Sequence, residues 1–395
     1  MKRFFSIIFF VMMVVAFGAS QDLATYTYLY DGAETIADQL NILQQVEKAN
    51  LSDSEEFFAN ALSRLLLEYP NTQMTLERAA ADTSARFLAG VLGDKKYTAA
   101  GRNLWRTVEI FSNPLVKADA LIALGKTGAV NYLPHILQIL QELNARPVPD
   151  REGGERIAYG AILALENYQD LSDELRNEAA IAVYLASKGW YSDRVQKQAE
   201  ASLAVIANDP AEPYASIIRR SSYSYASKYQ ALQSIDTNTQ TPAAVKAAVA
   251  VTALTEGWRL PTNDSRSRAV LTNLRKLAIG MINRYRTEDT AVYPLLEHSY
   301  RQGTDTQEKF DAVAALASLG TDDAVRLLSS FLMVMNSKLQ SNNVSMDDQQ
   351  MTRALISAIG DAGNSQGRPA LNVVLSLTWT DTIKRLANDA LSRLP

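Results

Sequence analysis

Ala120-Leu121-Ile122-Ala123-Leu124-Gly125 is the stretch that decides the fold, because versions of it recur along the chain. Each version places two large apolar residues three positions apart after a small residue, and a residue that favours turns often follows. That spacing puts both apolar side chains on one side of a helix. We call this pattern the repeat phrase; its other versions are at 161–166, 202–207, 231–236, 315–320, 355–360 and 390–395.

The repeat phrase returns at a nearly constant distance. Its last residues at positions 125, 166 and 207 are 41 apart, and those at 320 and 360 are 40 apart. A period of about 40 residues is typical of solenoids whose unit is a helical hairpin. We therefore predict an all-α fold with a repeat array over 112–395, in which each phrase helix pairs with the helix that follows it. A helical region over 21–111 precedes the array. There we expect 24–32 to be extended or irregular, and Ser52 to form a capping box with Glu55.

One part of the array has the character of a known family. Ala123-Leu124-Gly125-Lys126-Thr127-Gly128, followed by Leu133-Pro134, resembles the HEAT-like repeats first recognised in phycobilisome lyases. Residues 319–325 and 359–363 are similar. The resemblance implies a right-handed α-solenoid of HEAT-like helical hairpins. Members of this family are mostly scaffolds and adaptors, so it also implies a protein-binding role. It carries over no active-site residue.

Composition excludes several classes of function. The chain has no cysteine, which rules out disulfides, thiolate metal sites and a cysteine nucleophile. Its 39 basic and 43 acidic residues argue against nucleic-acid binding driven by bulk charge. Gly153-Gly154 lacks the preceding strand of a phosphate-binding loop and predicts a flexible loop instead. No HExxH or GxSxG motif is present, and we expect no cofactor and no metal.

The first twenty residues have the organisation of a secretory signal peptide. Lys2 and Arg3 supply positive charge, residues 4–17 are almost wholly apolar, and the small residues 18–20 follow. The apolar run is shorter than the roughly 20 residues of a membrane-spanning helix, which favours cleavage over a retained anchor. No second stretch is long and apolar enough to span a membrane. We therefore predict a signal peptide over 1–20 and an exported protein of the periplasm or cell envelope.

Three long connections between predicted helices suggest where a partner binds. They cover 144–155, 259–266 and 336–348. Each follows the second helix of a hairpin, so all should emerge on one edge of the array, and insertions on one face of a repeat array often mark its binding face. The first two connections carry Arg146, Arg151, Arg259 and Arg266. Because arginine suits carboxylates, we predict an acidic protein partner at this edge. The alternative is that the connections are solvated linkers.

A second interpretation belongs to the enzyme class. A helical-array hydrolase or lyase acting on envelope polymer would need clustered carboxylates, and Glu166, Asp170 and Glu174 are the candidates. The same residues also fit a solvated turn between two helices. His135 and His298 lack a second metal ligand at helical spacing, so we predict polar positions on helix surfaces for both.

Two further groups of polar residues have structural explanations. We interpret residues 322–323 as the acidic N-terminus of a helix. Tyr225 and Tyr229 share one helix face near Arg219 and Arg220, which fits ordinary packing or a surface that binds sugar or peptide.

Export can be tested on the protein itself. N-terminal sequencing of the chain purified from the envelope fraction should find a mature start after Gly18 or Ser20, because both precede an acceptable cleavage site. A purified chain that still begins at Met1 would show that the segment is retained.

Overall fold

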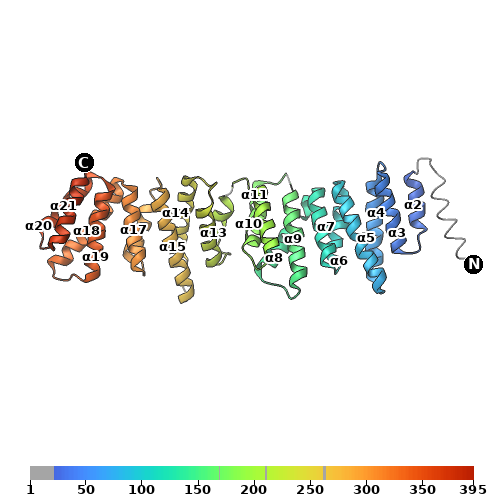
Figure 1. Ribbon diagram of the computed structural model, residues 1–395, viewed down its shortest axis with the longest axis horizontal. Coiled ribbons are helices and arrows are strands. Elements are labelled where there is room, and N and C mark those ends of the chain that lie inside the picture. The colour runs from blue at the N-terminus through green and yellow to red at the C-terminus, as the bar shows by residue number, and fades with distance from the viewer. Residues whose placement is uncertain (1–21, 169, 210, 261–263) are drawn as a thin grey trace, which may run out of the picture. The chain divides into compact units, whose positions relative to one another are not determined.

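The computed structural model of the chain describes residues 22–168, 170–209, 211–260 and 264–395. All regular structure in these ranges is helical, and it forms two compact units that divide between Asn208 and Asp209 (Figure 1). This is the all-α solenoid that the repeat phrase predicts. The predicted signal peptide lies outside the described ranges. Within them, no helix combines the length and the apolar composition needed to cross a membrane.

The first unit has two layers of helices. Odd-numbered helices pack against one another in a layer that we call the A layer, and even-numbered helices form the B layer. The A layer contains α3 (Ile36–Ala49), α5 (Thr75–Asp94), α7 (Pro114–Thr127), α9 (Arg151–Asn167) and α11 (Asp193–Ile206). The B layer contains α2 (Leu23–Asp31), α4 (Ser54–Glu68), α6 (Gly101–Ile110), α8 (Leu133–Ala145) and α10 (Asp173–Ser187). The predicted boundary at residue 112 lies inside this unit, where α5 and α6 both pack on α7.

The second unit repeats the same plan. Its A layer contains α13 (Tyr225–Thr237), α15 (Ser265–Tyr285), α17 (Thr306–Leu319), α19 (Met346–Ala362) and α21 (Asp381–Arg393). Its B layer contains α12 (Glu212–Arg219), α14 (Ala243–Arg259), α16 (Val292–Gln302), α18 (Asp322–Gln340) and α20 (Arg368–Ser376). Short 3₁₀ turns connect some helices in both units: η1 (Tyr69–Asn71), η2 (Thr98–Ala100), η3 (Val130–Tyr132) and η4 (Ser365–Gly367).

The hairpins are offset by one helix from the predicted pairing. The helix α7 packs on α6 before it, and α8 packs on α9 after it. In the second unit, α19 likewise packs on α18, and α20 packs on α21. The closely packed hairpin is therefore a B helix followed by an A helix. The prediction that each phrase helix pairs with the helix after it is wrong for α7 and α19, because the phrase specifies an apolar face but not which neighbour covers it.

Small residues bring neighbouring A-layer helices into backbone contact. A Cβ on Gly125 of α7 would lie 2.6 Å from the Cα of Ala164 in α9. One on Gly160 would lie 2.7 Å from the Cα of Ala118 on the same pair of helices. Heavy atoms do not approach so closely, so any side chain at either position would push the two helices apart. Small residues within and next to the phrase therefore allow α7 and α9 to stack.

Aromatic residues fill the wider spaces of the B layer. The rings of Tyr300 and Phe331 stack with centroids 3.9 Å apart between α16 and α18. The indole of Trp190, after α10, donates a hydrogen bond to the carbonyl of Leu143 in α8 at 2.7 Å. Near the C-terminus, Trp379 donates to the amide oxygen of the buried Asn336 at 2.8 Å. Each contact joins two successive B helices. Large aromatic rings therefore pack between the helices of the B layer, whereas small residues lie between those of the A layer.

The N-terminal region departs from prediction at two places. Residues 24–31, predicted to be extended or irregular, belong to the helix α2, which buries Tyr26 and Tyr30 in the core. Before α4 the N-cap residue is Asp53, with a φ of 58° and no side-chain cap, so the predicted capping box of Ser52 with Glu55 is wrong. Ser54 instead donates to the carbonyl of Leu51.

A buried ion pair connects α15 to α17. The guanidinium of Arg275 donates to both carboxylate oxygens of Glu308, at 2.6 and 3.0 Å. Arg275 is 4% exposed and Glu308 is fully buried. The guanidinium also donates to the carbonyl of Gly257 at 3.2 Å and lies 4.0 Å from the ring centroid of Trp258. Arg275 interrupts the apolar pattern of the sequence because it binds a carboxylate on the next A helix.

Removal of either half of this pair should destabilise the protein strongly. Glu308→Gln leaves a buried guanidinium without its counter-charge, so we expect the free energy of unfolding to fall by about 3–5 kcal/mol. The double variant Arg275→Met/Glu308→Leu should recover most of that loss. As a control, Glu297→Gln breaks the half-exposed pair with Arg301 and should change stability by about 0.5 kcal/mol or less. Urea unfolding would contradict this account if Glu308→Gln behaved like its control.

Candidate functional site

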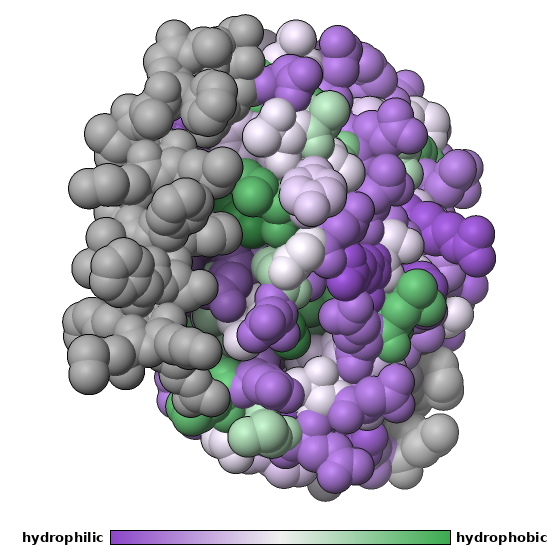
Figure 2. Space-filling model, turned by 90° about the vertical axis from the view of Figure 1, so that its right-hand side faces the viewer, coloured by the Kyte–Doolittle hydropathy of each residue, from purple (hydrophilic) through white to green (hydrophobic). Residues whose placement is uncertain are grey.

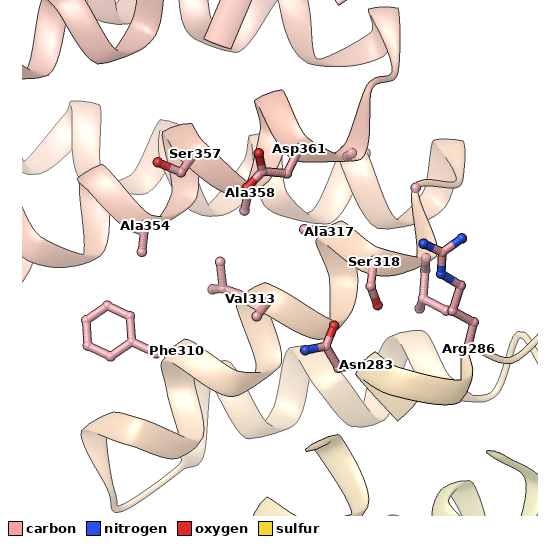
Figure 3. Close-up of a pocket in the computed structure, with 14 residues that line it drawn as sticks. Asn283, Arg286, Phe310, Val313, Ala317, Ser318, Ala354, Ser357, Ala358 and Asp361 are labelled. Carbon is pink, nitrogen blue, oxygen red and sulfur yellow. The ribbon is translucent and has the colours of Figure 1, made fainter. Parts of the chain in front are cut away.

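A hollow in the second unit lies across three A-layer helices. It has a volume of about 570 Å³ and is lined by α15, α17 and α19 (Figure 3). We call it the second-unit groove. Most of its walls are small side chains, namely Ala314, Ala317, Ser318, Ala354, Ser357 and Ala358. Larger groups stand at its two ends, with Phe310 and Arg286 on opposite sides in Figure 3. The volume is within the range of ligand-binding pockets.

Arg286 is the unusual residue of this groove. It follows the last residue of α15 with φ 55° and ψ 158°, a backbone conformation that is almost restricted to glycine. Its N–H donates to the carbonyl of Ile282 at 2.9 Å, which fixes the turn. Its side chain is exposed, and no ion pair joins it to any residue that the structure describes.

The other charged residue of the groove lining has an ion-pair partner. The groove's acidic residue, Asp361 of α19, forms an ion pair with Arg393 of α21. Nearby on α15, Arg284 pairs with Asp236 of α13 at 2.7 Å. Among the described residues Arg286 is therefore the charged side chain of the lining without an ion-pair partner, and it is suited to a negatively charged group.

A hollow of similar construction is present in the first unit. It has a volume of about 530 Å³ and lies at the C-terminal ends of α5, α7 and α9. Lys96, at its rim, has a φ of 52°, as Arg286 has a positive φ in the second unit. Lys126 pairs with Asp94 at 2.7 Å, and the exposed carboxylate of Asp170 is also part of the lining. Among the described residues Lys96 and Asp170 have no ion-pair partner, and because they are opposite in sign the unpaired charges of this lining cancel.

Both hollows reach the edge where A helices lead into B helices. The predicted binding edge is the opposite one, where B helices lead into A helices. There the helices extend into the connections predicted at 144–155, 259–266 and 336–348: α9 begins at Arg151, α14 ends at Arg259 and α18 continues to Gln340. Residues 261–263 of the second connection lie outside the described residues. Gly153-Gly154 is not a flexible loop but the buried first turn of α9, capped by the carboxylate of Asp150. Glycine is needed here because a Cβ on Gly153 would lie 2.8 Å from Pro114.

The four predicted partner-binding arginines differ in whether their side chains bind other residues of the protein. Arg151 is in α9, pairs with Glu155 and donates to the carbonyl of Trp190 at 2.8 Å. Arg259 is the last residue of α14 and binds Glu256 through two hydrogen bonds of 3.0 and 2.7 Å. Arg146, after α8, and Arg266, in the first turn of α15, are exposed. Binding at this edge remains a prediction, and two of its four cations already have intramolecular partners.

The carboxylates considered for catalysis have different surroundings. Glu166 is half-buried and accepts hydrogen bonds from Ser202 at 2.5 Å and from Gln198 at 3.3 Å, both on α11. Asp170 and Glu174 are exposed. No group of three or more histidine and acidic side chains in the described ranges could hold a metal ion.

The remaining polar candidates occupy helix surfaces and helix ends. His135 is exposed beside the ring of Trp105, and His298 is exposed with its ring edge-on to Trp258. Residues 322–323 form the first turn of α18 and are capped by Thr321, as predicted. Tyr225 and Tyr229 are both half-buried in α13.

The surface at the N-terminal end of the first unit faces the viewer in Figure 2. Hydrophobic residues there form separate patches between hydrophilic ones. A smaller hollow of about 330 Å³ is lined by both acidic and apolar residues of α2 and α4, including Asp31 and Phe57. It is smaller than the two A-layer hollows and carries more acidic than basic residues.

The strain at Arg286 can be measured. Arg286→Gly should increase the free energy of unfolding by about 1 kcal/mol, because glycine adopts this backbone conformation without steric cost. Arg284→Gly is the control: this residue is helical and paired with Asp236, so the change should lower stability by about 1 kcal/mol. Chemical denaturation that finds Arg286→Gly less stable than wild type would show that the side chain stabilises the fold.

Comparisons with known proteins give similarity of structure only. No protein-family model matches the chain, and no curated protein matches it. Human deoxyhypusine hydroxylase in complex with glycerol is similar at 14% identity over 87% of this chain and 97% of that chain, with a TM-score of 0.28. An engineered protein is similar at 13% identity over 95% of this chain and 96% of that protein, with a TM-score of 0.33. A chain of the SYS-1/POP-1 complex is similar at 13% identity over 95% of this chain and 60% of that chain, with a TM-score of 0.30.

Proposed function

We propose that this chain is an exported, non-catalytic scaffold of the periplasm or cell envelope, and that its second-unit groove receives a segment of a protein partner. The observation that carries the proposal is the groove itself, a hollow of about 570 Å³ with small-residue walls and an unpaired arginine at its rim. Export rests on the charged, apolar and small-residue organisation of residues 1–20.

Walls made of small side chains favour a polypeptide as the ligand. Alanine and serine side chains let a partner's backbone approach closely, while Phe310 and Val313 offer apolar contact. Helical arrays present such surfaces because their core is buried between neighbouring units and the outer faces remain available. The groove's acidic residue is already ion-paired with Arg393, and it has no second carboxylate facing it in the lining, so we propose no hydrolytic role for this site.

Filling the groove should abolish partner binding without unfolding the protein. Ala314 is exposed on α17 and lines the groove, so Ala314→Trp adds bulk where the partner would lie. Tagged wild-type and variant chains would be used to capture proteins from the envelope extract, with quantification by mass spectrometry. We expect Ala314→Trp to lose at least one partner that wild type enriches by about tenfold or more, a difference of about 1.4 kcal/mol.

A matched substitution controls for added bulk. Ala248 is exposed on α14 of the B layer and does not line the groove, so Ala248→Trp should capture partners as wild type does. Circular dichroism should show the same thermal unfolding for both variants. Equal capture by wild type and Ala314→Trp would place the binding surface elsewhere.

A further inference from the structure

We propose that the second-unit groove selects an acidic, apolar peptide segment, with a carboxylate of the partner bound by Arg286 and apolar side chains packed toward Phe310. This inference rests on the proposed function and adds the chemistry of the partner. It follows from the different character of the two ends of the groove.

One end of the groove and its floor determine that part of the ligand is apolar. Phe310 is half-buried at one end, so part of its ring is open to contact. Val313, between the two ends in Figure 3, is 2% exposed and contributes to the floor. Coverage of these side chains by apolar residues of a partner removes apolar surface from water, which is the main source of binding free energy.

The charge of the ligand is set by the other end. The guanidinium of Arg286 is exposed there without an ion-pair partner among the described residues, whereas Asp361 is already bound to Arg393. A basic partner would therefore meet an uncompensated positive charge, and an acidic partner would complement it. Arginine holds a carboxylate through two parallel hydrogen bonds, which gives orientation as well as attraction.

The backbone of Arg286 supports a role in binding over one in folding. A strained φ of 55° persists at a position where glycine would avoid the strain. The A helices α7, α17 and α19 do end in glycine with a positive φ, namely Gly128, Gly320 and Gly363. At the end of α15 an arginine takes the corresponding place and adds a cation at the rim of the groove.

The test is a selection from random peptides displayed on phage. Wild-type protein is the target, and peptides that also bind Ala314→Trp are removed first, so that the remaining peptides depend on the groove. We expect the enriched sequences to combine Asp or Glu with apolar residues. The same selection on Arg286→Glu should enrich Lys or Arg instead. A synthetic copy of the best acidic peptide should bind Arg286→Glu at least about tenfold more weakly than wild type.

The first unit provides the matched control. Lys96→Glu makes the same charge change at the rim of the hollow in the first unit, and it should leave the selected peptides and their affinity unchanged. Groove-dependent peptides without an excess of acidic residues, or with equal affinity for Arg286→Glu, would overturn the inference about charge and leave the proposed function standing. If no peptide depends on the groove, both are wrong. A loss of binding in Lys96→Glu would assign the site to the first unit.

Discussion

Backbone contact between neighbouring A-layer helices is the constraint on which the packing of α7 against α9 depends. Gly125 and Gly160 have no room for a side chain against Ala164 and Ala118, so these helices stack only where the sequence supplies small residues. The B layer has no such restriction and fills its spaces with stacked rings such as Tyr300 and Phe331. Both A-layer hollows reach the ends of the A helices that lead into the next B helix.

The repeat phrase predicts the helices well and their boundaries less well. Apolar residues three apart define the buried face of a helix such as α7, and this information is local. The start of α9 is different, because Gly153-Gly154 has the composition of a loop and is helical only since Asp150 caps it and Pro114 covers it. The tyrosines of α2 likewise alternate in sequence, yet Tyr26 and Tyr30 are one helical turn apart and both buried. In each case the deciding contact comes from a neighbouring element.

The candidate site was only partly accessible to sequence reasoning. Glycines at the ends of phrase helices mark the edge where the hollows open, and this signal is visible in Gly320 and Gly363. No sequence pattern points to Arg286. It is a candidate because its backbone has a positive φ and because it has no ion-pair partner among the described residues. The reverse holds for Arg151 and Arg259, which look available in sequence but have partners one helical turn away. An arginine becomes a candidate for binding only after its neighbours are known.

The buried pair of Arg275 and Glu308 also bears on how this array can evolve. Repeat proteins gain and lose whole units by recombination, which is tolerated when the contacts between successive units are interchangeable. The helices α15 and α17 are not interchangeable with the others, because each contributes one half of a buried charge pair. Deletion or duplication of one without the other leaves a charged side chain in an apolar core. We therefore expect the deletion or duplication of a helix to be tolerated better outside α15 to α17 than between these two helices.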